Sequence, residues 1–128
     1  MPEPRYFTPD NASIKRKTLC EPADPERLRL LRVEFPVAGR TFWHIHHDTQ
    51  ILIVVEGVGF YQHAQDKVAR KIVAGDTVYI PAGEKHWHGA APNSAMTHVV
   101  INGTQRGGET DWLEEVSDAE YLRVSTPH

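Results

Sequence analysis

The chain has 128 residues, a length that allows one compact domain able to bury roughly two-thirds of the surface of its unfolded state. Its 14 Lys and Arg against 17 Asp and Glu give a net charge of −3 with no basic stripe, which argues against a nucleic-acid partner, and its single cysteine excludes an intramolecular disulfide. No apolar run approaches the ~20 residues of a membrane-spanning helix, so we expect no membrane partner. One free thiol fits a reducing compartment, so we expect a cytoplasmic protein, and its expected partner is a small-molecule substrate.

Turn-forming residues divide the chain into many short segments of strand character, a pattern typical of an all-β sandwich or barrel. We expect residues 1–27 to form an N-terminal arm and a first strand, residues 28–105 the barrel, and residues 106–128 a C-terminal segment. Ser117 and Glu120 match the capping box of a short helix that runs to Arg123. The expected strands, in chain order, are Ile14–Leu19, Leu28–Phe35, Thr41–His46, Ile51–Val55, Gly59–Ala64, Val68–Val73, Thr77–Ile80, His86–Ala90 and Thr97–Asn102.

Two of these strands bear on how the sheet is covered. Residues 51–55 are apolar at every position, which predicts a strand covered on both faces, by the barrel interior and by another sheet or subunit. Residues 28–35 alternate between apolar and charged side chains. A single chain would leave part of this apolar surface uncovered, so we expect a homodimer.

The eight histidines are the unusual feature of the composition. Side chains at positions i and i+2 of a strand point to the same face, so His44 and His46 project together. A loop after them would let Gln50 turn toward the same spot, and His86, on a strand that follows a tight turn, can complete three imidazoles and one amide oxygen. Imidazoles that face inward are costly unless their lone pairs are satisfied, and a divalent metal satisfies them. Surface histidines, or histidines satisfied within the core, are the alternative.

Two motifs around these residues resemble those of the cupin family. Residues 39–46 (GRTFWHIH), with Gln50 and Gly57, resemble the first cupin motif, and Gly75, Pro81, Gly83 and His86 resemble the second. The resemblance covers residues 28–102. It implies a cupin double-stranded β-helix, which is a jelly-roll barrel, with a metal at its centre.

A narrower resemblance comes from residues 85–92 (KHWHGAAP) and 95–98 (AMTH). They are similar to small single-domain bacterial cupins, including those associated with carboxymuconolactone decarboxylases and the manganese-dependent hydroxynitrile lyases of cupin fold. This resemblance implies that the metal ligands are His44, His46, Gln50 and His86. It also implies a catalytic role for His98, whose parity with Val100 points it into the barrel; a core histidine bonded to a neighbouring strand is the alternative.

The expected pocket takes further residues from the same comparison and from strand parity. His88 lies on the same strand face as His86. Arg40 has the same parity as His44, so Arg40 is a candidate for binding an anionic substrate. A surface salt bridge is the commoner role of such an arginine. Leu31, Val33 and Asn102 correspond to pocket-lining positions of the lyases, and Leu31 and Asn102 differ from them in kind.

The expected ligand set has a chemical consequence. Gln50 stands where the family usually has glutamate, so every protein ligand is neutral and the metal keeps its full charge as a Lewis acid. We expect one divalent ion per chain, with Mn or Fe favoured by the resemblance and Ni or Zn as alternatives.

Three functions are compatible with such a site. The first is a metal-dependent lyase or isomerase acting on a small hydroxy or carbonyl compound, with hydroxynitrile cleavage as one case. The second is an iron-dependent dioxygenase. The third is a non-enzymatic, metal-containing module that binds small molecules.

Overall fold

The computed structural model describes residues 4–20 and 28–123, and the predicted all-β barrel with a short C-terminal helix is confirmed. The elements are β1 (Tyr6–Phe7), the 3-10 turn η1 (Pro9–Asn11), β2 (Lys15–Cys20), β3 (Arg29–Phe35), β4 (Arg40–Thr41), β5 (His44–His46), β6 (Gln50–His63), β7 (Arg70–Val73), β8 (Thr77–Ile80), β9 (His86–Ala90), β10 (Met96–Asn102), β11 (Thr110–Trp112) and α1 (Asp118–Tyr121). The predicted capping box of α1 is present, with Ser117 as the N-cap.

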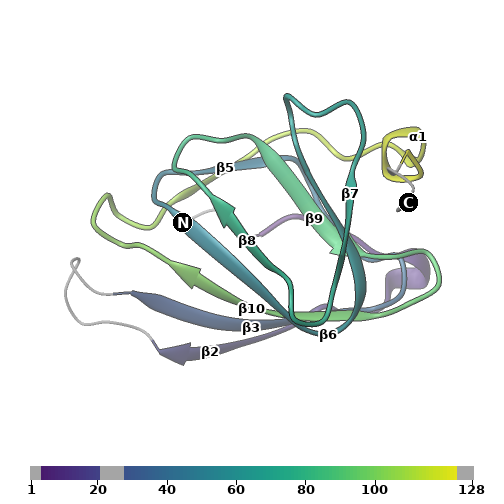
Figure 1. Ribbon diagram of the computed structural model, residues 1–128, viewed down its shortest axis with the longest axis horizontal. Coiled ribbons are helices and arrows are strands. Elements are labelled where there is room, and N and C mark those ends of the chain that lie inside the picture. Colours follow the sequence, from purple (N-terminus) through teal and green to yellow (C-terminus); the bar gives the residue numbers. More distant parts are fainter. Residues whose placement is uncertain (1–3, 21–27, 124–128) are drawn as a thin grey trace.

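The strands form one curled antiparallel sheet whose two halves face each other (Figure 1). The order along the sheet is β1-β4-β9-β6-β10-β3-β2. The long strand β6 belongs to both halves, because residues 50–57 pair with β10 or β8 and residues 58–63 pair with β7 or β9. β2 and β3 continue the first half beyond β10, and β4, β5 and β9 lie in the second half.

The prediction of two separate strands at 51–55 and 59–64 is wrong, because β6 runs without interruption from Gln50 to His63. Gly57 has φ +81°, and the pairing of β6 with β10 shifts by one residue nearby, so that His98 lies opposite Val54 and Thr97 opposite Glu56. An extra residue of this kind bends a strand and increases its twist. The bend takes β6 from one half of the barrel to the other.

Two short strands, β1 and β11, were not predicted, and two others, β4 and β5, were predicted as a single strand. β1 lies in the expected arm and pairs with β4, and β11 pairs with β5. The expected strand over 41–46 is interrupted, because the backbone N–H groups of Phe42 and Trp43 donate to carbonyls outside the ladder. Strands of two or three residues are too short to show a periodic pattern. The sheet therefore includes strands on either side of residues 28–105.

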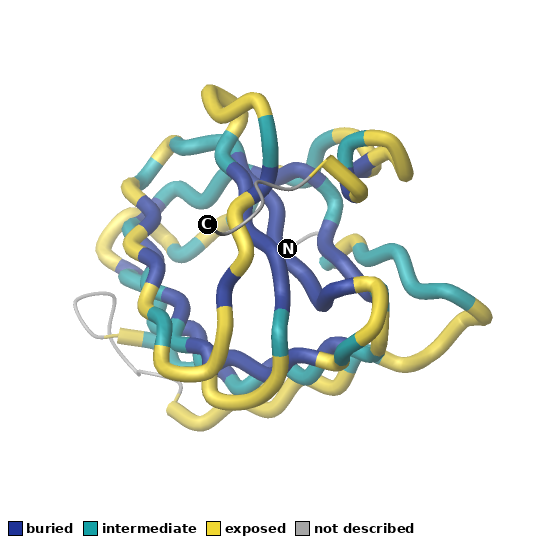
Figure 2. The backbone as a smooth tube through the Cα atoms, turned by 45° about the vertical axis from the view of Figure 1, so that its right-hand side comes forward, coloured by how far each residue is buried: buried dark blue, intermediate teal, exposed yellow. Residues whose placement is uncertain are grey.

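Two clusters of apolar side chains stabilise the barrel. The larger lies between the two halves, and the smaller includes Tyr121 of α1. In the backbone trace of Figure 2, buried stretches run along the central strands and exposed stretches lie at the turns. Trp43 and Trp87 belong to the smaller cluster. On β6, Leu52 and Val54 are buried whereas Val55 is 38% exposed, so the outer face of residues 51–55 is only partly covered within the chain. No helix among the described residues is long and apolar enough to cross a membrane.

Candidate metal centre

A cavity of about 420 Å³ lies between the two halves of the barrel. Its walls come from both halves, since β5 and β9 supply His44, His46 and His88 while β6 and β10 supply Gln50 and His98. The polar groups that the sequence placed far apart therefore meet in one space.

Strand pairing brings the candidate ligands together. His44 on β5 is the register partner of His86 on β9, and their ring centroids are 4.2 Å apart. The ring of His46 lies 4.8 Å from that of His44 and 5.2 Å from that of His86. His44 and His86 are fully buried side chains, at 1% and 0% exposure.

Hydrogen bonds at the Nδ1 atoms fix how these rings are presented. His44 Nδ1 donates to the Phe42 carbonyl at 2.8 Å, and His86 Nδ1 donates to the Glu84 carbonyl at 2.9 Å. Because a carbonyl only accepts, both rings carry their proton on Nδ1 and keep a lone pair on Nε2. His46 Nδ1 is likewise bonded to the Thr110 hydroxyl, at 2.9 Å. A partner on the second ring nitrogen is what holds a metal-binding imidazole in place.

The buried side-chain atoms that have no hydrogen-bond partner are suitable ligands for a metal ion. His46 Nε2, His86 Nε2 and Gln50 Oε1 are buried and have no hydrogen-bond partner. A buried polar atom without a partner costs about 1–3 kcal/mol, and two imidazole nitrogens with an amide oxygen are suitable donors for a divalent transition metal. The residues at this position therefore fit the ion that the sequence predicts.

The structure also draws His88 into the cluster. Ligand atoms of His44, His86 and His88 lie within 4.8 Å of one another. The ring of His88 is 5.4 Å from that of His44 and 5.7 Å from that of His86, slightly farther than the ring of His46. Its Nδ1 is 3.2 Å from Nε2 of His98, so His88 joins the cluster to the histidine predicted to be catalytic.

All five imidazoles are neutral near pH 7. Burial lowers the pKa of His46 to about 3, and those of His86 and His98 to about 4. Burial also holds the pKa of His44 and His88 well below the usual range of histidine. Neutral rings have the lone pairs that metal binding requires.

The predicted pocket residues separate into two groups. Leu31, Val33, His88 and Asn102 line the cavity, as does His98.

Arg40 does not line the cavity. Its guanidinium lies between the rings of Phe7 and Tyr121, 4.4 and 4.1 Å from their centroids, and bonds Asp118 at 2.8 Å. Arg40 has the parity of His44, but the chain leaves the ladder at Phe42 and Trp43, so parity does not carry over from β4 to β5. Its position indicates a role in fastening α1 to the barrel rather than in binding a substrate.

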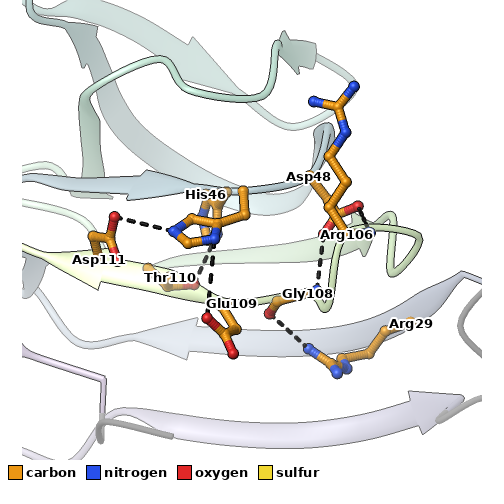
Figure 3. Close-up of polar contacts among 9 residues, drawn as sticks. Arg29, His46, Asp48, Arg106, Gly108, Glu109, Thr110 and Asp111 are labelled. Carbon is orange, nitrogen blue, oxygen red and sulfur yellow. Dashed lines mark hydrogen bonds and ion pairs between the residues drawn. The ribbon is translucent and has the colours of Figure 1, made fainter.

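A segment between β10 and α1 lies along one side of the site, where it contacts Asp48 (Figure 3). Residues 106–112, which we call the strap, include β11. The Asp48 carboxylate accepts the backbone N–H groups of Arg106 and Gly108, each at 2.8 Å, and His47 bonds Asp111 at 3.0 Å. That contact with the Asp111 carboxylate raises the pKa of His47.

The strap places two side chains at the candidate ligands. Thr110 bonds His46, and the ring of Trp112 lies 4.7 Å from that of His44, with 30° between the planes. Both residues line the cavity. Strand periodicity could not have predicted either contact, because three residues of strand carry no readable period.

Comparisons with known proteins agree with this architecture. A family model described as a cupin domain matches residues 31–102. An (R)-mandelonitrile lyase from Granulicella tundricola is 40% identical over 118 residues, which are 92% of this chain and 87% of that protein. A crystal structure of a cupin-like protein from Thermotoga maritima is 38% identical with a TM-score of 0.79, covering 84% of this chain and 81% of that one. A polyketide cyclase from Streptomyces resistomycificus shares the fold, at 22% identity and a TM-score of 0.66, over 84% of this chain and 75% of that one.

Proposed function

The chain belongs to the cupin domain family, and from that membership we propose that it is a metal-dependent lyase acting on a small hydroxy or carbonyl compound, with hydroxynitrile cleavage as the concrete reaction. Identity of 40% to a mandelonitrile lyase supports this reaction class. The observation that carries the proposal is a neutral imidazole, His98, in the same cavity as three of the candidate metal ligands, His44, His46 and Gln50.

The proposed ligands are His44, His46, Gln50 and His86. Their support is the set of buried, unpartnered donor atoms on three of them and the Nδ1 contact that orients His44. We propose manganese or iron as the ion, with nickel or zinc as alternatives. When bound, a divalent ion supplies Lewis acidity that lowers the pKa of a hydroxyl or stabilises a leaving anion.

The proton transfers fall to the His88–His98 pair. The substrate hydroxyl gives its proton to neutral His98, and the hydrogen bond between His98 Nε2 and His88 Nδ1, at 3.2 Å, orients the imidazole that receives it. The carbon–carbon bond to the nitrile then breaks, its electron pair leaves as cyanide, and the carbonyl product forms. Cyanide takes the proton back from His98, so that the products are an aldehyde and hydrogen cyanide.

The decisive experiment measures cleavage of (R)-mandelonitrile by the metal-loaded protein, with the release of benzaldehyde as readout. We expect His98→Ala to lower kcat by about 10²–10⁴-fold, the usual contribution of a general acid–base group, with the metal content unchanged. Thr77→Ala is the control, because Thr77 is at an exposed strand position and does not line the cavity.

Two outcomes would overturn parts of this proposal. If metal-loaded His98→Ala has the same kcat as the wild type, His98 has no role in the mechanism. Absence of cleavage by the wild type with Mn, Fe, Ni or Zn would remove hydroxynitriles as substrates, and oxygen uptake by the iron form with a diketone or catechol would then assign the dioxygenase class.

A further inference from the structure

Asp48 is a buried acid in the turn between β5 and β6, two residues from His46 and two from Gln50. Its side chain is 7% exposed and does not line the cavity that holds those two ligands. A carboxylate is costly to bury unless it is hydrogen-bonded, and both of its oxygens are used. Oδ1 accepts the N–H of Arg106 and Oδ2 that of Gly108, each at 2.8 Å (Figure 3). The carboxylate therefore binds the backbone of the strap.

The turn at the start of the strap needs such a contact to keep one conformation. Gly107 and Gly108 have φ of +96° and +64°. Glycine loses more conformational freedom on ordering than any other residue, so fixing this turn has a high entropic cost. Hydrogen bonds to a charged acceptor are roughly twice as strong as neutral ones. The two bonds to Asp48 lie on either side of Gly107, where that cost has to be offset.

The same segment carries the two side chains that contact the candidate ligands. β11 follows the turn directly and pairs with β5. The Thr110 hydroxyl bonds His46 Nδ1 at 2.9 Å. The ring of Trp112 lies 4.7 Å from that of His44. A strap that left Asp48 would carry both contacts away from the ligands, so the docking of the strap is linked to the orientation of two candidate ligands.

We propose that Asp48 is a positioning residue of the metal centre, which holds the strap so that Thr110 and Trp112 stay against the candidate ligands, and that strap docking and the binding of a divalent ion stabilise each other. Coupling of this kind is reciprocal, so a docked strap raises the metal affinity and a bound ion favours the docked strap by the same factor. The inference rests on the proposed function for the presence of the ion, and not for the reaction.

The first measurement is manganese affinity, by chelator competition, in a double-mutant cycle of Asp48→Asn and Thr110→Val. Asparagine keeps the shape of the side chain and replaces one acceptor oxygen with a donor, so that one N–H of the strap loses its partner. We expect Asp48→Asn alone to lower the affinity about 10-fold. In the Thr110→Val background it should lower the affinity less than about threefold, because most of its effect passes through that hydroxyl. A variant that only destabilises the fold would show the same factor in both backgrounds.

The second measurement is hydrogen exchange of β11 by mass spectrometry, without metal and with manganese. In the metal-free protein, Asp48→Asn should speed the exchange of β11 about 10-fold and leave that of β10 unchanged, because β10 belongs to the barrel and not to the strap. Manganese should slow the exchange of β11 in the wild type. Neither measurement depends on turnover.

Asp76→Asn is the matched control. The Asp76 carboxylate also accepts a backbone N–H, that of Val73 at 2.8 Å, and neither residue lines the cavity. This variant should leave both measurements unchanged. Gly107→Ala is a second variant, which keeps the test valid if Asp48→Asn does not fold. It leaves every residue that lines the cavity in place and puts a side chain at φ +96°, so it should change both measurements in the same direction as Asp48→Asn.

Three results would overturn the inference. They are an equal factor for Asp48→Asn in both backgrounds, an exchange of β11 that rises no more than that of β10, and an exchange of β11 in the wild type that manganese leaves unchanged. A wild type that shows the coupling and cleaves no hydroxynitrile refutes the proposed reaction alone. Cleavage of mandelonitrile together with any of the three results refutes the inference alone.

Discussion

At the scale of single residues, the site depends on side chains that hold the candidate ligands rather than on the ligands alone. His44 and His86 are held by the backbone carbonyls of Phe42 and Glu84, each two residues earlier in the chain. These carbonyls are present whichever residue stands at positions 42 and 84. His46 is held by a side chain, the hydroxyl of Thr110, from the strap. The orientation of His46 can therefore be changed without touching a ligand.

Replacing Thr110 with valine keeps its shape and removes the hydroxyl. We expect Thr110→Val to lower the metal affinity about 10- to 100-fold, the usual effect of losing a partner of a metal-bound histidine. Chelator competition measures this affinity, and Thr77→Val, at an exposed strand position, is the control. Unchanged affinity in Thr110→Val would mean that packing alone orients His46.

Two groups of three histidines could hold the metal ion. Both include His44 and His86, and the third histidine is either His46 or His88. The unpartnered Nε2 of His46 favours the group with His46, whereas Nδ1 of His88 is engaged with His98. We expect His46→Ala to lose the metal measured by elemental analysis, and His88→Ala to retain most of it. The reverse result would assign the ion to His44, His86 and His88.

At the scale of elements, the barrel depends on how closely β4 approaches β9. Arg40 on β4 is the register partner of Gly89 on β9. A Cβ atom at Gly89 would lie 2.6 Å from the Arg40 Cα atom and against the Gly39 carbonyl, which are backbone atoms and cannot turn aside. The glycine is therefore required for the pairing that leads the chain into β5 and its histidines.

We expect Gly89→Ala to lower the free energy of unfolding by about 1–3 kcal/mol or more, as overpacking does when backbone must shift. Gly103→Ala is the control, since a Cβ there meets its nearest atom at an ordinary 3.4 Å. Denaturant unfolding of the two variants measures the difference. Equal stability of both would show that β4 moves away from β9 at little cost.

At the scale of the whole molecule, the outer face of the first half carries an apolar row. Tyr79, Ile51, Ile101 and Leu30 are successive register partners on β8, β6, β10 and β3, and Tyr79 is 63% exposed. This is the outer face that the apolar composition of residues 51–55 predicted to be covered. A second copy of the chain is the partner that we expect on it.

The expected dimer has a direct test in sedimentation equilibrium at micromolar concentration. Tyr79→Glu should weaken self-association at least 10-fold and leave the fold unchanged by circular dichroism, because it places a charge in the apolar row. Leu122→Glu changes another exposed residue, 65% exposed beside α1, and should leave association unchanged. A wild type that sediments as a monomer would refute the expectation.

The sequence by itself determined the fold class and most of the strands, and it predicted the candidate ligands. Alternation, turn residues and the i, i+2 spacing of His44 and His46 are local signals, and a side chain's face follows from its own strand. The histidine at position 98 was likewise assigned by parity and family resemblance, and the structure places it in the cavity.

Only the tertiary structure decided which distant groups surround those residues. The bend at Gly57, the pairing of β11 with β5 and the position of Arg40 outside the cavity all depend on contacts between strands far apart in the chain. Register across a sheet is set by the packing of the whole barrel. A local pattern predicts on which face of the sheet a side chain lies, but it does not predict which residues are its neighbours on the adjacent strands.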